Sequence, residues 1–230
     1  MIFDSKGFAL RNQCPGYDFP FQLWCLPGGR TKDLVDLLEN RIEKAVKRHS
    51  NIIIYFWSGT CDITIKKGKY IYLRSENSKI VQHITEEYYR AIDIVKNYGF
   101  KVVLKFVECP TLSIYRCNFV KGKSNYNRYI KQDKTATKQI EQLNSRIREI
   151  NSNILNANTL AVSKYLVKRR KKRGKKKPRY SVNLNVNQPD GIHPGRQLSL
   201  AWTKYFLKDP YKECYVQYDK QEIVDIHISV

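Results

Sequence analysis

The sequence has no long hydrophobic run, because its longest unbroken apolar stretch is the six residues from Ile52 to Trp57. A helix that spans a bilayer needs about 20 predominantly apolar residues, so nothing here predicts a membrane span. The opening residues 1–11 also lack the apolar core of about 7–15 residues that marks a secretory signal peptide. We therefore expect an intracellular protein, located in the cytoplasm or the nucleus.

Cysteines at metal-binding spacing are missing as well. The chain has six cysteines, and none belongs to a CxxC pair: Cys14, Cys25, Cys61, Cys109, Cys117 and Cys214. This excludes the common zinc and thioredoxin-type patterns. We expect reduced thiols rather than a disulfide framework, and no metal or organic cofactor.

Acidic residues are scarce relative to basic ones. The chain has 21 Asp and Glu against 42 Lys and Arg, which gives a formal net charge of +21. Ten of the basic residues lie between positions 168 and 179, and without them the charge is +11 (21 − 10). So dense a run is typical of a disordered, solvated loop, and it matches a nucleic-acid-binding patch or a signal read by a nuclear-import receptor. The ten residues are Lys168, Arg169, Arg170, Lys171, Lys172, Arg173, Lys175, Lys176, Lys177 and Arg179.

The rest of the composition is that of a folded protein. Of the 230 residues, 42% are hydrophobic and 12% are aromatic, which is enough for a core and excludes a wholly disordered chain. We expect a single domain over residues 1–230. The basic residues 168–180 would form a loop inserted in it.

Strand and helix patterns alternate along the chain. The run Ile52–Trp57 is typical of a strand buried on both faces, as in a parallel sheet. Apolar residues recur at helical spacing after Thr31, which we interpret as an N-cap. Further helices are expected over 80–98, 140–154 and 197–206, further strands over 21–26, 101–107, 181–186 and 214–230, and a loop over 121–134. This order predicts an α/β fold, namely a three-layer α/β/α sandwich with a mostly parallel sheet.

Reactive or glycine-rich residues follow four of the expected strands, the first of which is the short opening segment Met1-Ile2-Phe3. The four segments are Asp4-Ser5-Lys6-Gly7, Gly28-Gly29, Gly59-Thr60-Cys61-Asp62 and Asp190-Gly191-Ile192-His193. Ligands of such folds bind beyond the carboxyl ends of the strands, so we expect all four segments on one rim. Each alone has an ordinary structural explanation, such as a helix N-cap or a plain turn.

The order of the four segments resembles that of the SGNH (GDSL-like) hydrolases, a family of flavodoxin-like serine esterases and acylhydrolases. The Gly-Asp-Ser block of that family reads Phe3-Asp4-Ser5 here, and its glycine loop before a helix reads Gly28 to Leu34. Its Gly-x-Asn-Asp block reads Gly59 to Asp62, and its Asp-x-x-His block reads Asp190 to His193. The resemblance runs from Met1 to about Leu207 and is interrupted by the basic run.

The resemblance implies a Ser-His-Asp triad that cleaves an ester or acyl bond. Ser5 would be the nucleophile, and His193 the general base that removes its proton. Asp190 would hold and polarise the imidazole. The other three histidines, His49, His83 and His227, are interpreted as surface or packing residues.

The oxyanion hole is where the sequence departs from the family. The resemblance implies that Ser5, Gly28 and Cys61 occupy its three positions, but the family has an asparagine where Cys61 stands. A thiol is a weak donor, and loss of one such donor costs about 10²–10³ in rate. We therefore expect a weak esterase or acylhydrolase, with Cys61 as a replacement nucleophile left open.

The alternative is a protein of another class. It would be a catalytically degraded SGNH-like module, as in viral and mobile-element proteins, which binds nucleic acid or another polyanion through the basic run. Such binding would fall steeply with salt.

Overall fold

The structure is a computed structural model that describes residues 1–11, 22–77, 79–123, 125–154, 157, 159–163, 167–170, 179–182 and 189–210. Several of the expectations above concern residues outside these ranges. They are Cys14, Cys214, His227, the expected strand over 214–230 and the central part of the basic run.

Four parallel strands form the central sheet. In spatial order they are β2 (Trp24–Cys25), β1 (Ile2–Phe3), β3 (Ile52–Trp57) and β6 (Val102–Phe106). The N-terminal strand is thus an inner strand, with Phe3 level with Cys25 on one side and Trp57 on the other. The carboxyl ends of β2, β1 and β3 therefore lie side by side at one edge of the sheet, and Ser5 follows the middle one.

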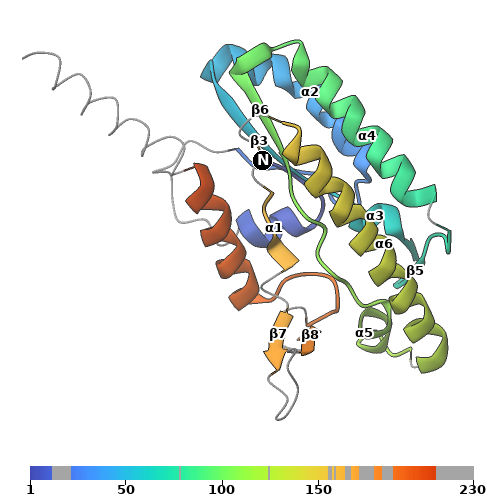
Figure 1. Ribbon diagram of the computed structural model, residues 1–230. Helices are drawn as coiled ribbons and strands as arrows, with labels where there is room; N and C mark the ends of the chain where they lie inside the picture. The colour runs from blue at the N-terminus through green and yellow to red at the C-terminus, as the bar shows by residue number, and fades with distance from the viewer. Residues whose placement is uncertain are drawn as a thin grey trace, which may run out of the picture.

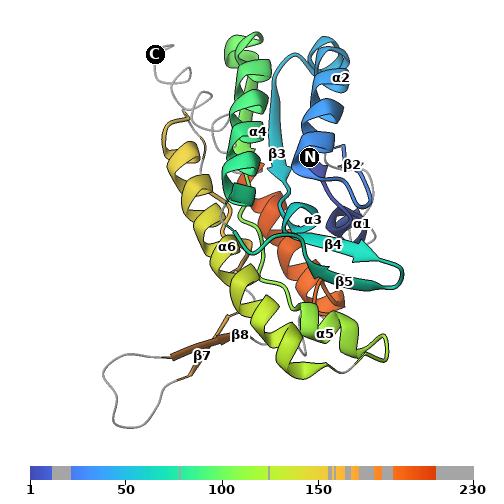
Figure 2. The ribbon, with the colours of Figure 1, turned by 90° about the vertical axis from the view of Figure 1, so that its right-hand side faces the viewer.

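Helices cover both faces of this sheet (Figures 1 and 2). The helices on one face are α2 (Thr31–His49), α4 (Lys79–Lys96) and α6 (Tyr126–Ser152). On the other face lie α1 (Lys6–Arg11) and a helix over residues 196–210. Period-two alternation in β3 explains both layers, because Phe56 packs on the first face and Trp57 on the second. The expected three-layer α/β/α sandwich is confirmed.

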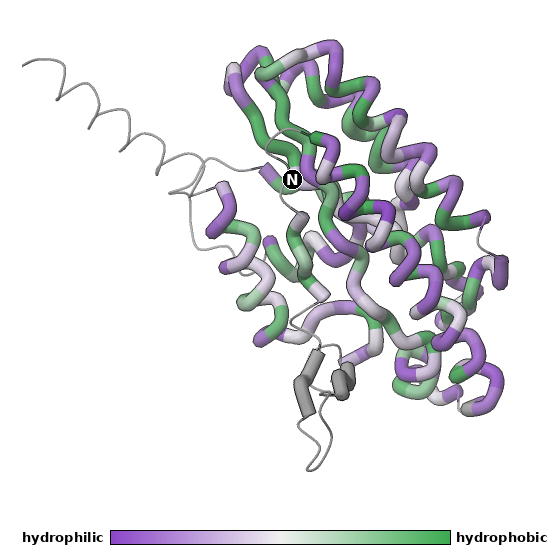
Figure 3. The backbone as a smooth tube through the Cα atoms, in the orientation of Figure 1, coloured by the Kyte–Doolittle hydropathy of each residue, from purple (hydrophilic) through white to green (hydrophobic). Residues whose placement is uncertain are grey.

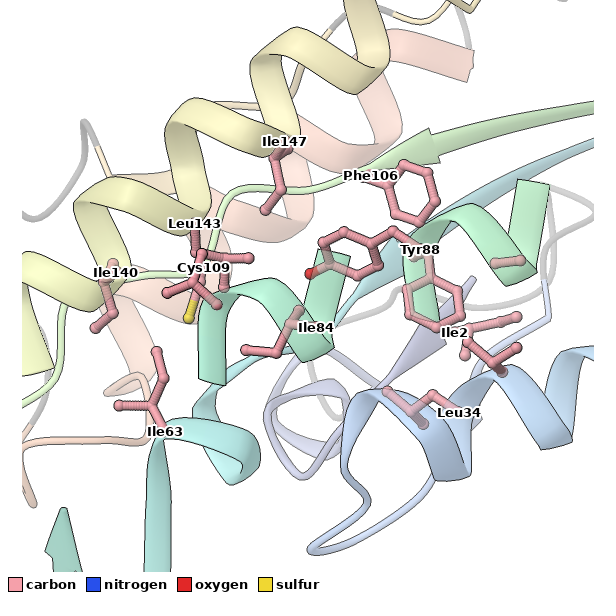
Figure 4. Packing of buried hydrophobic residues seen from close by; sticks show 14 of the residues in the cluster. Ile2, Leu34, Ile63, Ile84, Tyr88, Phe106, Cys109, Ile140, Leu143 and Ile147 are labelled. Carbon is pink, nitrogen blue, oxygen red and sulfur yellow. The ribbon is translucent and has the colours of Figure 1, made fainter. Parts of the chain in front are cut away.

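The larger core lies between the sheet and the three long helices. Hydrophobic positions run continuously along β3 and recur at intervals along α2 and α4 (Figure 3). Tyr88 of α4 is buried against the sheet, with its ring centroid 4.4 Å from that of Phe106. Figure 4 shows Leu143 and Ile147 of α6 in the same cluster.

The core on the second face is aromatic and holds the C-terminal helix in place. The ring centroids of Trp57 and Trp202 are 5.1 Å apart, and those of Phe3 and Phe206 are 5.5 Å apart. The indole N–H of Trp202 donates to the carbonyl of Val162 at 3.0 Å. The helix that follows His193 is therefore fixed directly on β1 and β3.

Five elements between β3 and α6 were not predicted from the sequence. A short helix α3 (Thr60–Ile63) follows β3 and leads into an antiparallel hairpin of β4 (Thr64–Lys67) and β5 (Tyr70–Leu73). A further short helix, α5 (Ile114–Phe119), precedes α6. A 3-10 turn, η1 (Gly99–Lys101), separates α4 from β6.

Two helix starts differ from the predictions. The loop expected over 121–134 is wrong from Tyr126 onward, because the Asn125 side chain caps α6 there by accepting the Arg128 N–H at 3.3 Å. The N-cap of α2 is Arg30 rather than Thr31. Thr31 is the first helical residue, and its hydroxyl bonds to Asp62 instead.

The two ends of the basic run belong to a short antiparallel pair of strands. β7 (Val167–Arg170) pairs antiparallel with β8 (Arg179–Val182). Residues 171–178 lie outside the described ranges, so the disordered loop stays a prediction. No helix in the described part of the chain is both long and apolar enough to cross a membrane.

Candidate active site

Three side chains from opposite ends of the chain form a hydrogen-bonded row. Ser5 Oγ lies 3.2 Å from His193 Nε2, and His193 Nδ1 lies 2.7 Å from Asp190 Oδ2. The side chains of His193 and Asp190 are 47% and 37% exposed, so solvent reaches the row. In this arrangement a carboxylate orients an imidazole, and the imidazole can take a proton from a hydroxyl.

The loop that carries the imidazole is organised by Asp190. Its Oδ1 accepts the backbone N–H groups of Ile192 at 2.9 Å and of His193 at 2.7 Å, while its Oδ2 faces the ring. Burial acts to raise the pKa of Asp190, but the hydrogen bonds from His193 and from the two backbone groups outweigh it and lower the pKa. The carboxylate is therefore ionised at neutral pH, as an orienting group must be.

Gly191 fits this loop against α5. Its φ is +80°, and a Cβ there would lie 2.6 Å from the carbonyl oxygen of Ser113. The Ser113 N–H donates to the Gly191 carbonyl at 2.7 Å, and the Arg116 Nε–H donates to the Pro189 carbonyl at 3.0 Å. The close approach of Gly191 to Ser113 therefore needs a residue without a side chain. The two hydrogen bonds hold the loop, and with it His193, against α5.

The residues beside Ser5 are anchored by a buried ion pair. Lys6 and Asp4 are only 0% and 1% exposed, and Lys6 Nζ lies 2.5 Å from Asp4 Oδ2. The same ammonium donates to Thr60 Oγ1 at 2.6 Å, and it lies 5.4 Å from the ring centroid of Trp57. Burial acts to lower the pKa of Lys6, but the charge and hydrogen bond of Asp4, together with the effects of Cys109 and Cys61, outweigh it and raise the pKa. The turn that presents Ser5 is thus tied to the start of α3, a link that the sequence did not predict.

A second buried cluster joins α2 to α3. The Asp62 carboxylate accepts the backbone N–H of Thr31, at 3.0 Å from Oδ2, and the Thr31 hydroxyl at 2.8 Å. The Thr31 hydroxyl is also 2.9 Å from Ser58 Oγ, which lies 3.0 Å from the Tyr88 hydroxyl. Burial raises the pKa of Asp62 despite these donors. The glycine loop and the segment that carries Cys61 are therefore held together.

Comparison with known proteins finds structural relatives only. No family model matches the sequence, and no curated protein matches it. A protein from Streptococcus pneumonia, described provisionally as a platelet activating factor, is 16% identical, with 90% of this chain and 80% of that chain covered and a TM-score of 0.55. The acetyl xylan esterase AlAXEase is 13% identical, with 90% and 96% covered and a TM-score of 0.51. The chain has the fold of the SGNH hydrolases. Identities this low show the fold alone.

In the SGNH fold, the strand order places the three expected oxyanion positions at one edge of the sheet. Ser5 follows β1, Gly28 lies in an exposed turn after β2 with φ +71°, and Cys61 lies in α3 after β3. Arg74 Nη2 donates to the Cys61 carbonyl at 2.9 Å and so holds α3 from the β5 side. Their role as an oxyanion hole stays a prediction.

Cys61 has the properties of a neutral thiol. Burial is the largest cause that raises its pKa, to about 11, and the Asp4 carboxylate adds to the effect. A thiolate is the nucleophilic form of cysteine, so this environment disfavours Cys61 as a replacement nucleophile.

Two other histidines in the described part of the chain have partners outside the row formed by Ser5, His193 and Asp190. His49 and His83 are exposed and contact Gln22 at 3.3 Å and Glu86 at 3.2 Å, respectively. His83 and Glu86 lie three positions apart on α4. They form an exposed pair of a histidine and a carboxylate with the same sequence spacing as Asp190 and His193.

Proposed function

We propose that this chain is a serine hydrolase of the SGNH type that cleaves an ester or acyl bond. Ser5 is the nucleophile, His193 the general base and Asp190 the group that orients the imidazole. The observation that carries the proposal is the row of two hydrogen bonds that joins these side chains, at 3.2 Å and 2.7 Å.

The side chains of this row can carry out each proton transfer that an acyl-transfer reaction requires. Ser5 Oγ attacks the carbonyl carbon while His193 Nε2 takes the hydroxyl proton, and the ionised Asp190 stabilises the imidazolium. His193 then gives that proton to the leaving oxygen as the carbon–oxygen bond breaks, which leaves an acyl-serine. Water, deprotonated by the same imidazole, hydrolyses this ester and restores the Ser5 hydroxyl.

The chain is expected to be a slow enzyme. The negative charge of the tetrahedral intermediate must be stabilised by donors beside Ser5, and in this chain the third donor is the thiol of Cys61. Loss of one such donor typically costs about 10²–10³ in rate. Because burial keeps this thiol protonated, it remains a weak S–H donor rather than a competing negative charge.

Turnover of p-nitrophenyl acetate tests the proposal. We expect measurable hydrolysis by the full chain, and loss to the uncatalysed background in Ser5→Ala and in His193→Ala. His83→Ala is the matched control, because its imidazole also faces a carboxylate three positions away but is exposed on α4, whereas Ser5 contacts His193. Turnover that survives Ser5→Ala, or a wild-type chain without turnover, would contradict the proposal.

The basic run has a separate proposed role. Contact with nucleic acid or an import receptor through residues 168–179 stays a prediction, because most of the run lies outside the described residues. It does not depend on the triad.

A further inference from the structure

The β4–β5 hairpin forms a surface that is fixed to α5 and α6 by side-chain hydrogen bonds. Asn118 accepts the N–H of Ile71 at 2.9 Å and donates to its carbonyl at 2.7 Å, so it pairs with β5 much as a neighbouring strand would. Gln132 accepts the N–H of Leu73 at 2.9 Å. Figure 2 shows β4, β5 and α5 together at one end of the molecule. The side chains on this surface are therefore held in a defined arrangement.

The segments that form this surface carry charged residues of one sign only. Residues 64–73 and 114–131 contain eight Lys and Arg and no Asp or Glu. We call this surface the hairpin face; its cations are Lys66, Lys67, Lys69, Arg116, Lys121, Lys123, Arg128 and Lys131. Asp133, which follows closely in the sequence, is engaged inward by the Ser113 hydroxyl at 2.7 Å and the Ile114 N–H at 2.6 Å. The two segments thus contribute no carboxylate to offset the repulsion among their cations, although Arg116 lies beside the Asp190 loop, and a bound polyanion would relieve that repulsion.

Tyrosine rings lie among these cations. Lys123 Nζ is 4.5 Å from the ring centroid of Tyr70, and Lys69 Nζ is 5.3 Å from it. The guanidinium of Arg128 is 5.7 Å from the ring of Tyr72, whose hydroxyl is 3.0 Å from Lys123 Nζ. Both rings are partly exposed. Cations and ring faces are thus interleaved rather than segregated.

This combination fits one class of partner. Proteins that bind single-stranded nucleic acid without sequence preference combine a basic surface that follows the phosphates with aromatic rings on which bases stack. The hairpin face has both, and Phe119 adds a ring that is 48% exposed. We propose that the hairpin face binds single-stranded nucleic acid, with phosphates around the hairpin tip at Lys66, Lys67 and Lys69 and bases against Tyr70, which is paired with Lys67. The proposal requires neither the triad nor the basic run.

The test compares two triple variants of the full chain, with binding of a fluorescein-labelled 20-nucleotide oligo(U) measured by anisotropy from 50 to 200 mM KCl. The hairpin variant is Lys66→Gln, Lys67→Gln, Lys69→Gln. The control variant is Lys44→Gln, Arg48→Gln, Lys101→Gln, which removes three exposed cations near the C-terminal ends of α2 and α4, at the other end of the molecule (Figure 2). Both variants keep the basic run and lose the same charge.

The hairpin variant should bind at least tenfold more weakly than the control. Its plot of log affinity against log salt should be shallower than wild type by about 2, because each lost phosphate contact on a single strand contributes about 0.7. Equal affinities for the two variants would overturn the proposal, since net charge alone would then explain the binding.

A stacking variant tests the role of the aromatic ring. Tyr70→Ala should weaken binding at least fivefold with an unchanged salt dependence, because a stacked ring contributes affinity without releasing counterions. A far-ultraviolet circular dichroism spectrum equal to that of wild type shows that the variant is folded. Unchanged affinity in the folded variant would contradict base stacking. Loss of binding to phosphatidylserine vesicles but not to oligo(U) in the hairpin variant would identify a membrane surface instead and overturn the proposal.

Discussion

Ser5 Oγ lies 3.2 Å from His193 Nε2 although 188 positions separate the two residues in the sequence. The contact follows from the packing of the aromatic side chains beneath it. Phe3, two residues before Ser5, has its ring centroid 5.5 Å from that of Phe206, which belongs to the helix that follows His193. One aromatic core thus holds both ends of the candidate site.

The Asp190–His193 loop should be intolerant of a side chain at Gly191. A Cβ at this position would lie 2.6 Å from the Ser113 carbonyl oxygen, whereas one at Gly122 would meet nothing within 4 Å. The two glycines have similar φ angles, +80° and +84°, so Gly122→Ala isolates the cost of backbone strain, about 1–2 kcal/mol. Gly191→Ala should be more destabilising in urea unfolding and should also lower ester turnover. Equal destabilisation by the two substitutions would show that contact with α5 does not constrain this loop.

Restoring an amide at position 61 should accelerate hydrolysis. Cys61→Asn supplies the third oxyanion donor. It should raise kcat by at most about 10²–10³-fold, which is the effect typical of one such donor. Cys61→Ala, which supplies no donor, should not raise it. The comparison is made by steady-state kinetics on p-nitrophenyl acetate. An asparagine variant no faster than wild type would refute the explanation of slow turnover by the missing amide.

The buried pair of Asp4 and Lys6 should show strong coupling in stability. Lys6→Met leaves the Asp4 carboxylate buried without its ammonium partner, which typically costs about 3–5 kcal/mol. The double variant Asp4→Asn, Lys6→Met leaves no unpaired charge and should be more stable than Lys6→Met alone. Urea unfolding of wild type, both single variants and the double variant measures the coupling. Additive effects would mean that the two groups do not interact as the structure shows.

Much of the layer architecture was predictable because a few segments have unambiguous patterns. The run Ile52–Trp57 is apolar throughout and does form an inner strand, β3. The helical spacing over 80–98 corresponds closely to α4. These patterns reflect burial on the sheet, which decides the structure of both segments.

The elements that were not predicted have local sequence patterns that differ from those typical of the secondary structure they form. β4 and the turn after it contain Lys66, Lys67 and Lys69, whose exposed charges conceal the strand pattern. α6 begins at Tyr126, within a polar stretch that reads as a loop, because Asn125 caps it. Such starts depend on a single side chain rather than on a periodic pattern.

The residues of the candidate site could be predicted from the sequence, but the buried contacts that hold them in place could not. The resemblance to the SGNH hydrolases singled out Ser5, Asp190 and His193, which the structure brings together. It gave no indication that Lys6 would be completely buried, because lysine is among the residues least often found in a core. Its burial depends on Asp4 and Thr60, and Thr60 becomes a neighbour only through the pairing of β1 with β3.

Covalent labelling with a fluorophosphonate tests the central claim most directly, because the Ser5 oxygen would displace fluoride from phosphorus in a single stoichiometric event that even a slow enzyme completes. After incubation of the full chain, digestion and mass spectrometry locate the adduct. The account predicts an adduct on Ser5 in the wild type and in His83→Ala, and none in His193→Ala. A wild-type chain that stays unlabelled, or an adduct on another residue that persists in Ser5→Ala, would contradict it.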